Sequence, residues 1–440
     1  MNVLNRNINN IFFIFALSHL IIWTLVPSIV NKNLPLDTIE ALAWGSNLDW
    51  GFNKHPPMSA FFPEIFFQIF GSQDWAYYLL SQFFVLIAFY FVFKFSYEIL
   101  DNAKLSLISV LLLESIFFYN FTTPEFNVNV CQLPFWSLVV YYSWKIYENQ
   151  KIQLKDCFLV GLFASLGFLS KYLFIYLLVS IDLLFIYLIF FKKTKKFDFK
   201  YLISLEVFIV LLVPHFIWLF NNDFITITYG LKRTGLETSG ILDHLKYPII
   251  FLLKQLGILI PFFFLIYLLI KKIKFKINFK DNKLLFLIFI NILPIALIFL
   301  TSIITGSKIR TMWMTPFYLF FGVLFVYILR FQINVKKINS FLYGFLFLFF
   351  LSPALYTYES ISKTDKRTDY PGKEIAAKVQ IVWDNDFDEE IEFVTGNEWT
   401  AGNLSYHLIS RPKWEGNKND KILEKSSEFI CVDDVCLGRY

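Results

Sequence analysis

Cysteine and histidine are scarce in this sequence, which has four cysteines and five histidines among 440 residues. Cys131 and Cys157 lie in apolar segments, where an unpaired cysteine behaves as a small hydrophobic residue. Cys431 and Cys436 lie near the C-terminus, at a spacing that fits a disulfide across a tight hairpin in an oxidising compartment. Because no further cysteine or histidine lies near this pair, the sequence argues against a metal site there.

Short-period repeats, low-complexity segments and a signal-peptide cleavage site are also absent from the sequence. The missing repeats give no support to a repeat architecture. The first apolar run ends in Val26-Pro27-Ser28, which is not the small-residue A-x-A site that a signal peptidase needs. We therefore expect this run to be retained as the first membrane span.

Apolar side chains, in contrast, are abundant. They make up 56% of the residues, 55 of which are phenylalanine, and the mean hydropathy is +0.54. Ordinary globular domains contain about 45–50% apolar residues, so a single soluble core cannot bury this surface. Runs of roughly 18 apolar residues predict about eleven membrane spans. They lie near residues 10–30, 75–97, 104–120, 127–147, 156–170, 171–191, 201–220, 247–270, 284–305, 311–329 and 338–356.

Lysine and arginine collect in the loops that alternate spans would place on one side. The densest are 190–200 and 270–283, and Lys145, Lys151, Lys155, Arg330, Lys336 and Lys337 extend the set. The positive-inside rule makes this side cytoplasmic. We therefore expect a multi-pass protein of the inner (cytoplasmic) membrane, with its N-terminus inside and its C-terminus in the periplasm. The net charge of +5 then reflects topology and gives no support to nucleic-acid binding.

Three regions between or after the predicted spans are more polar than the rest of the chain: 31–72, 221–246 and 357–440. The expected fold is an all-α polytopic membrane domain over 1–356 with helices lying along the outer interface, followed by a small α/β extracytoplasmic domain over 357–440. The outer-face loop 31–72 carries the first candidate site residues.

Asp37 and Glu40 follow the first span directly, and two interpretations of them stay open. Asp37 with Glu40 three residues later fits the capping box of a helix over 37–49. Alternatively, Asp37 is a general base at a membrane-facing site, and Glu40 contacts the substrate. Capping alone leaves the neighbouring sequence "WGSNLDWGFNKHPP" unexplained.

Lys54 and His55 precede two prolines that fix the local backbone. A basic group held opposite a carboxylate suits a phosphate-bearing donor, because one charge binds the leaving phosphate while the other activates the acceptor. Trp44 and Trp50 are either interfacial aromatics or platforms for stacking a sugar ring.

Other charged residues lie at the outer ends of the expected spans. Glu125, in a Thr-Thr-Pro turn, is either a solvated turn residue or a second catalytic acid. Lys171 interrupts two apolar runs, and a lysine within the membrane is a functional candidate unless it snorkels to the interface. Four basic residues are expected on the outer face, against the positive-inside rule: Lys232, Arg233, Lys308 and Arg310. They either bind the phosphate of an anionic lipid substrate or make ordinary contacts with lipid headgroups.

The ordered motifs resemble the dolichyl-phosphate-mannose-protein mannosyltransferase family, in its bacterial branch related to the lipid A aminoarabinose transferases. The resemblance spans roughly 10–356. It is carried by the acidic residue after the first span, W-x(5)-W-G-x-x-K-H-P-P, T-T-P-E, L-S-K-Y, P-x-x-x-W and a late K-x-R-x-x-W. It implies the C-type glycosyltransferase fold, a polyprenyl-phosphate-linked sugar donor, and inverting transfer at the outer face.

Carried over by position, the resemblance makes Asp37 the catalytic acidic residue and Glu125 the second one, where relatives usually have aspartate. Lys54, His55, Lys171, Lys308 and Arg310 are then expected to meet the donor phosphate, and Glu40, Trp44, Trp50, Lys232 and Arg233 to contact substrate. No cofactor is expected to be essential. The resemblance allows a divalent cation, because some members of the family bind one, but no metal ligands are assigned.

The preferred hypothesis is a glycosyltransferase acting on lipid A, lipopolysaccharide or another envelope glycan. We expect it to work as a monomer whose partners are the donor lipid, a lipid or glycan acceptor and membrane lipids. One alternative is transfer to serine or threonine of secreted proteins. Another is a transporter of a polyprenyl-linked lipid, although transporters usually show paired repeats with interrupted helices, and no internal symmetry is evident.

Overall fold

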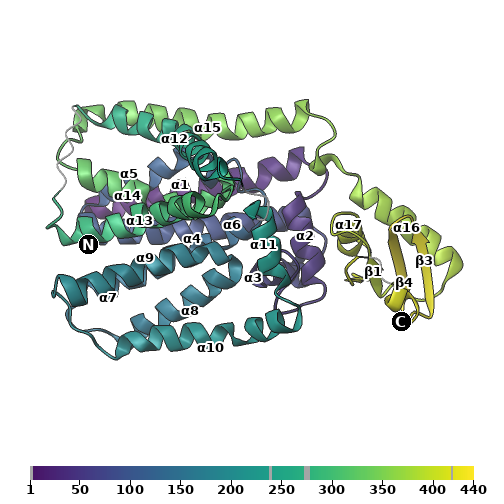
Figure 1. Cartoon of the computed structure of the whole chain (residues 1–440). Helices are drawn as coiled ribbons and strands as arrows, with labels where there is room; N and C mark the ends of the chain where they lie inside the picture. The colour runs from purple at the N-terminus through teal and green to yellow at the C-terminus, as the bar shows by residue number, and fades with distance from the viewer. Residues whose placement is uncertain (1–2, 237–239, 272–277, 418–419) are drawn as a thin grey trace.

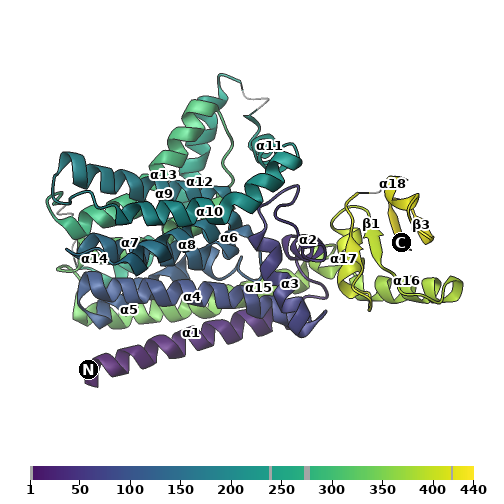
Figure 2. The same ribbon diagram turned by 90° about the horizontal axis from the view of Figure 1, so that it is seen from below.

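The chain folds into a helical bundle with a small sheet-containing unit at one end (Figure 1). The computed structural model describes residues 3–236, 240–271, 278–417 and 420–440. The N-terminus lies at the end of the bundle far from that unit, as two perpendicular views agree (Figure 2).

Within the described residues, seven helices are long and apolar enough to cross a membrane, and the bent pair η6 (Thr311–Tyr318) and α14 (Phe321–Leu329) makes an eighth if it forms one span. The expected fold class is therefore confirmed as mostly helical and multi-pass, but the count of eleven spans is not. The other three expected spans correspond to shorter helices: α5 (Ala103–Leu111), α7 (Leu133–Glu148) and α8 (Leu154–Ser170). The seven are α1 (Val3–Val30), α4 (Asp74–Leu100), η3 (Tyr172–Phe174) with α9 (Ile175–Ile186) and η4 (Tyr187–Phe191), α10 (Lys200–Asn221), α12 (Asp243–Leu269), α13 (Asn282–Thr305) and α15 (Ile338–Ser362).

The lysine-rich loops lie together at one end of the bundle. Lys192 Nζ donates to the side-chain oxygen of Asn282 at 2.7 Å, Lys195 Nζ donates to the carbonyl of Asn149 at 2.7 Å, and Lys337 Nζ donates to the carbonyl of Ile270 at 2.8 Å. This end carries the N-terminus and lies opposite the C-terminal unit (Figure 1). The arrangement is the one that the expected topology requires; the lysines at 272–277 lie outside the described residues.

Short helices close the opposite end of the bundle. They are α2 (Leu36–Gly45), α3 (Met58–Phe70), α6 (Val128–Cys131) and α11 (Ile225–Arg233), with the 3-10 turns η1 (Leu112–Ser115) and η2 (Phe117–Tyr119) nearby. The capping box predicted for Asp37 is wrong. Pro35 occupies the N-cap position of α2 without a side-chain hydrogen bond, and the helix starts at Leu36 because the proline fixes the preceding backbone. Asp37 therefore lies inside the first turn, and its carboxylate is free for another role.

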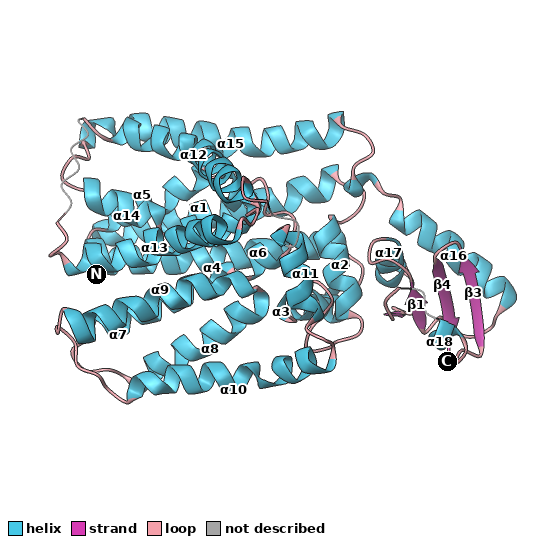
Figure 3. Ribbon diagram, viewed as in Figure 1, coloured by secondary structure: helices cyan, strands magenta, loops and turns pink. Residues whose placement is uncertain are grey.

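Among the described residues, strands occur only in the C-terminal unit (Figure 3). Its sheet has the order β2-β1-β4-β3, with a parallel β1–β2 pair and antiparallel β1–β4 and β3–β4 pairs. Cys431 and Cys436 face each other across the β3–β4 hairpin and form a disulfide. The elements are η8 (Arg367–Asp369), α16 (Gly372–Asp386), β1 (Phe393–Thr395), α17 (Thr400–His407), β2 (Lys413–Trp414), α18 (Asp420–Leu423), β3 (Glu428–Val432) and β4 (Val435–Arg439).

Candidate active site

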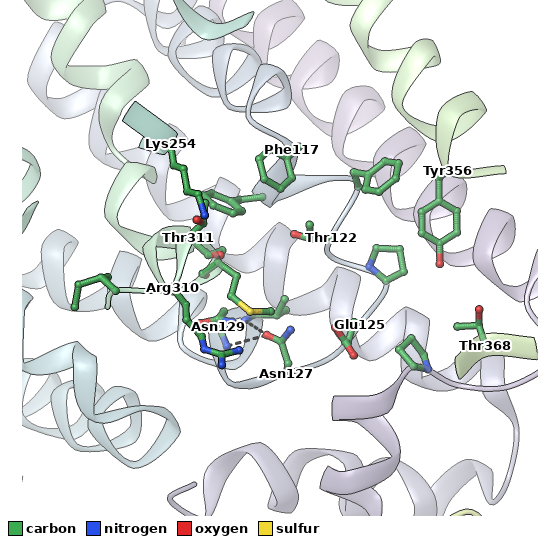
Figure 4. Close-up of a pocket in the computed structure, with 18 of the residues that line it drawn as sticks. Phe117, Thr122, Glu125, Asn127, Asn129, Lys254, Arg310, Thr311, Tyr356 and Thr368 are labelled. Carbon is green, nitrogen blue, oxygen red and sulfur yellow. Dashed lines mark hydrogen bonds between the residues drawn. The ribbon is translucent and has the colours of Figure 1, made fainter. Parts of the chain in front are cut away.

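A cavity of about 680 Å³ opens at the end of the bundle that carries α2. Apolar side chains such as Phe117 form much of its wall, and four charged residues interrupt that wall: Glu125, Lys254, Lys308 and Arg310. Figure 4 shows Glu125 and Arg310 at this cavity, with Lys254 entering from α12. A largely apolar cavity with one carboxylate and several cations suits an amphiphile with an anionic head.

The loop that carries Glu125 is held by hydrogen bonds on both sides. The Thr123 hydroxyl donates to the carbonyl of Asn120 at 2.7 Å and accepts from the Gln82 amide at 3.1 Å. On the other side, the Asn127 side chain accepts from the backbone N–H groups of Asn129 and Val130, and so caps α6. Backbone fixed in this way gives the Glu125 carboxylate a defined place at the cavity.

Glu125 is joined directly to the start of α2. One of its carboxylate oxygens accepts a hydrogen bond from the backbone N–H of Asp37 at 3.0 Å, and the Thr38 hydroxyl donates to the carbonyl of Phe126 at 3.2 Å. The first N–H groups of a helix lack partners within it and favour a negative charge nearby. The two carboxylates predicted to be catalytic are thus brought together from segments 88 positions apart.

Burial and mutual repulsion affect the protonation of these two acids. Burial, together with the neighbouring Asp37 carboxylate, raises the pKa of Glu125 to about 8. Burial also raises the pKa of Asp37, but the positive charges of Lys171, Lys54 and Arg233 act against this rise. The nearby cations thus favour the ionised form of Asp37, which is the form that can accept a proton.

Lys171 supplies the strongest of the positive charges that act on Asp37. The chain leaves the helical conformation at this residue, between α8 and η3, and its side chain is only 5% exposed. The ammonium donates to the Asn129 side chain and lies 5.2 Å from the centre of the Trp313 ring. Instead of snorkelling to the interface, Lys171 points into the bundle.

Lys54 is already paired with two carboxylates. Its ammonium lies 2.9 Å from Glu40 Oε1 and 3.2 Å from Glu398 Oε1. Burial lowers the pKa of Lys54, but these two carboxylates outweigh it and hold the pKa above its ordinary value. Glu40, predicted to contact substrate, therefore contacts Lys54 in the structure.

His55 lacks the positive charge that its predicted role implied. Burial and the charges of Lys171, Lys54 and Arg233 lower its pKa to about 3. The imidazole is therefore neutral at physiological pH, and it can meet a phosphate only as a hydrogen-bond donor. The correction arises because burial and neighbouring cations together oppose protonation.

The loop carrying Lys54 and His55 is clamped by α10 and α11. His215 Nδ1 forms a 2.6 Å hydrogen bond with the carbonyl of Trp50, and Trp218 Nε1 donates to Asp49 at 2.6 Å. The Thr226 hydroxyl donates to the carbonyl of Phe52 at 2.6 Å. The P-x-x-x-W motif thus has a structural role, because its tryptophan holds the loop.

The two tryptophans of this loop have different environments. Trp44 is 2% exposed and stacks on Phe52 with ring centres 5.6 Å apart. The predicted stacking of Trp44 on a sugar ring is therefore wrong, because its faces are covered by protein. Trp50 is 44% exposed, and its contact with substrate stays a prediction.

The predicted outer cations lie in two neighbouring segments. Arg233 ends α11, and its charge helps to lower the pKa of Arg310, an effect that comes mainly from burial. The backbone N–H of Lys308 donates to the carbonyl of Thr234, which joins the two segments. Within the described part of the chain, Arg233 and Arg310 form no ion pair. Neighbouring unpaired cations of this kind suit an anionic ligand. Lys232 is exposed in the last turn of α11.

Lys254 is a charged residue of the cavity that is not among the site residues predicted from the sequence. This residue lies in the middle of α12, lines the cavity, and also lines a neighbouring one of about 340 Å³. Lysine in an apolar span is the same signal that identified Lys171, so the sequence did contain the information. Tyr356 and Thr368 also line the cavity, but a tyrosine and a threonine carry no comparable signal.

No three histidine, cysteine, aspartate or glutamate side chains lie close enough to hold a metal ion in the ranges that the structure describes.

Comparison with known proteins agrees with this fold. Residues 54–218 match the model of the dolichyl-phosphate-mannose-protein mannosyltransferase family, which confirms the resemblance predicted from the motifs. Among curated proteins, none has significant sequence similarity to the chain. The fold is similar to the crystal structure of ArnT from Cupriavidus metallidurans bound to undecaprenyl phosphate, with 12% identity, a TM-score of 0.65, and coverage of 92% of this chain and 85% of that one. The apo ArnT structure gives 11% identity, a TM-score of 0.58, and coverage of 91% and 74%.

Proposed function

We propose that this relative of the dolichyl-phosphate-mannose-protein mannosyltransferases is a membrane glycosyltransferase that uses a polyprenyl-phosphate-linked sugar. The observation that carries the proposal is the pairing of Asp37 with Glu125 through the Asp37 backbone N–H, where Glu125 lines a cavity whose other charged side chains are cations. The similarity in fold to an ArnT bound to undecaprenyl phosphate supports a polyprenyl phosphate as the lipid partner. We place the site on the periplasmic side of the inner membrane, at the end opposite the lysine-rich loops.

In the proposed reaction, Asp37 accepts the proton of an acceptor hydroxyl. The acceptor oxygen forms a bond to the anomeric carbon while the bond from that carbon to the phosphate oxygen breaks, and the polyprenyl phosphate leaves with the electron pair. Attack on the face opposite the phosphate inverts the anomeric centre. The phosphate gains negative charge during this step, so nearby cations stabilise the transition state more than the bound donor. Lys171 and Arg310 are the cations that we assign to it.

Reconstitution tests this proposal. The purified chain in proteoliposomes is supplied with a radiolabelled polyprenyl-phosphate sugar and with envelope lipids from a strain that lacks the gene. We expect label to move from the donor lipid to an acceptor. Movement of the donor lipid across the bilayer without any transfer would contradict the proposal and favour a transporter.

The acceptor is proposed to be lipid A, lipopolysaccharide or another envelope glycan, and the runner-up is serine or threonine of secreted proteins. Mass spectrometry of both pools, with and without the gene, separates the two. Loss of a sugar from the lipid or glycan pool alone is the expected result, and loss from secreted proteins alone would favour the runner-up.

The protonation of Glu125 predicts an alkaline limit to activity. Because burial and Asp37 raise the pKa of Glu125 to about 8, its carboxyl is neutral below that pH and becomes a second negative charge above it. We expect kcat/KM to fall above about pH 8 in the wild type. In Glu125→Gln, which cannot ionise, we expect this fall to disappear and at least a tenth of the neutral-pH activity to remain. A pH–rate profile that keeps the same alkaline limb in the variant would show that another group titrates there.

Lys254 is expected to contribute to substrate binding. Replacing it with methionine keeps the length and apolar stem but removes a charge from the cavity wall. A charge-assisted contact is worth roughly 1.5–3 kcal/mol, so we expect KM for the lipid-linked donor or the anionic acceptor to rise about tenfold or more. Lys246→Met, at an exposed position on the same helix, is the matched control. Equal effects of the two variants would remove Lys254 from the site.

A further inference from the structure

The C-terminal unit is docked firmly against α2 and α3, the two short helices that follow the first span, and against the start of α4. The Tyr406 hydroxyl lies 2.7 Å from Asp74, and Arg411 donates both to Glu64 at 2.8 Å and to the carbonyl of Leu42 at 2.7 Å. A methyl group added at Gly402 of α17 would lie 3.0 Å from the Ala43 side chain of α2. Helices this close leave little freedom for the unit to move relative to α2.

Glu398, just before α17, extends from this unit into the charged network of the site. Its Oε1 accepts from Asn53 Nδ2 at 2.7 Å and from Lys54 Nζ at 3.2 Å. Its own position is fixed, because the side chain of the adjacent Asn397 accepts hydrogen bonds from the N–H groups of Trp399 and Thr400 at the start of α17. The Glu398 side chain is 14% exposed, so water screens this ion pair less than it would at an open surface.

Lys54 needs such a partner to keep one orientation. A lysine side chain has a flexible four-carbon stem, and fixing it in one conformation costs up to about 2 kcal/mol of rotamer entropy. Glu40 lies on α2 and Glu398 on the C-terminal unit, so the ammonium is held between two carboxylates that approach from different parts of the chain. Because Asn53 shares the same Glu398 oxygen, the carboxylate also orients the loop backbone before Pro56 and Pro57.

We propose that Glu398 is a positioning residue of the active site, through which the C-terminal unit fixes Lys54 and the 53–55 loop beside Asp37. The inference rests on the proposed function and deepens it, since it makes the C-terminal unit part of the catalytic machinery. Thr368, in the segment between α15 and α16, lines the cavity and accepts backbone hydrogen bonds from Lys32 and Asn33, so the same part of the chain reaches the site at a second point.

The test compares Glu398→Gln with Glu64→Gln in the full-length protein. Both variants remove a carboxylate from the interface between the C-terminal unit and the bundle, but only Glu398 contacts Lys54. Small displacements of a binding group can cost up to about 100-fold, so we expect kcat/KM for the polyprenyl-phosphate sugar to fall roughly 10- to 100-fold in Glu398→Gln. Glu64→Gln is expected to lower the melting temperature while leaving kcat/KM within about twofold.

Two further measurements separate positioning from mere docking. In a Lys54→Met background, Glu398→Gln is expected to have no additional effect, because the contact with Lys54 is already gone and the glutamine amide oxygen can still accept from Asn53. The rate at which acetic anhydride acetylates Lys54, followed by mass spectrometry across pH, reports its pKa without any transfer assay. Loss of a neighbouring carboxylate lowers that pKa, so Lys54 should react faster at a given pH in Glu398→Gln and as in the wild type in Glu64→Gln.

Unchanged acetylation of Lys54 in Glu398→Gln would overturn the inference, and so would an equal loss of transfer in Glu64→Gln. Faster acetylation with undiminished transfer would overturn it as well, because the contact would then exist without serving catalysis. A wild-type protein that transfers no sugar contradicts the proposed function instead, and that result is distinguishable because the acetylation of Lys54 still reports the contact.

Discussion

Replacing Asp37 with asparagine is expected to reduce sugar transfer about a thousandfold and to leave the protein folded in the membrane. The amide keeps the size and shape of the side chain but cannot accept a proton, and a positioned general base is worth roughly 10²–10⁴ in rate. The hydrogen bond that joins α2 to Glu125 uses the backbone N–H of Asp37, so the substitution leaves it intact. The measurement is kcat/KM with a labelled polyprenyl-phosphate sugar, alongside a thermal unfolding curve.

The position of Asp37 within α2 makes this result informative. If Asp37 were the N-cap, asparagine would replace it at little cost in both stability and activity; the N-cap is Pro35, however. Asp223→Asn is a matched control, since Asp223 is exposed, forms no ion pair in the described ranges, and has a positive φ that asparagine tolerates. Turnover by Asp37→Asn close to that of Asp223→Asn would remove Asp37 from the chemistry.

Apolar run length located the helices well because burial in a bilayer depends on local composition alone. The length of an apolar run does not, however, predict whether the run forms one continuous helix. The run at 104–120 is mostly apolar, yet α5 ends at Leu111, and the backbone at Ile116 is extended, with φ −104° and ψ 111°. The polar Glu114 and Ser115 in that stretch are buried, so protein neighbours, rather than lipid, set the local conformation.

The site residues divide in the same way. Lys171 and Asp37 were identifiable because ionisable groups beside hydrocarbon are costly and need a reason. Glu398, the partner of Lys54 on the C-terminal unit, was not identifiable. It lies 345 positions from Asn53, the neighbour of Lys54, and only the folded chain brings these residues together. The stacking role proposed for Trp44 failed for a related reason: exposure depends on the packing of Phe52 and Ala60 around the ring, which a local motif does not encode.

Replacing Lys171 with methionine is expected to lower kcat about 100-fold while leaving the stability of the protein unchanged or slightly raised. Methionine fills the space of the lysine stem, and burying an ammonium costs free energy that the methionine does not incur. The remaining contacts of Lys171, to Asn129 and to the ring of Trp313, recover only part of that cost. We propose that Lys171 is buried despite this cost in stability because its ammonium contacts the leaving phosphate. Electrostatic stabilisation of this kind is worth about 10²–10³ in rate.

Two features distinguish this role from a structural one. Charge on the phosphate grows as the glycosidic bond breaks, so kcat should fall more than KM rises. Lys171 is also the leading positive charge that acts on Asp37, so its loss should raise the pKa of that carboxyl and move the acidic limb of the pH–rate profile to higher pH. Lys378→Met, on the exposed face of α16, should change neither quantity. A Lys171→Met protein that melts at a much lower temperature, or whose acidic limb does not move, would assign Lys171 to packing instead of catalysis.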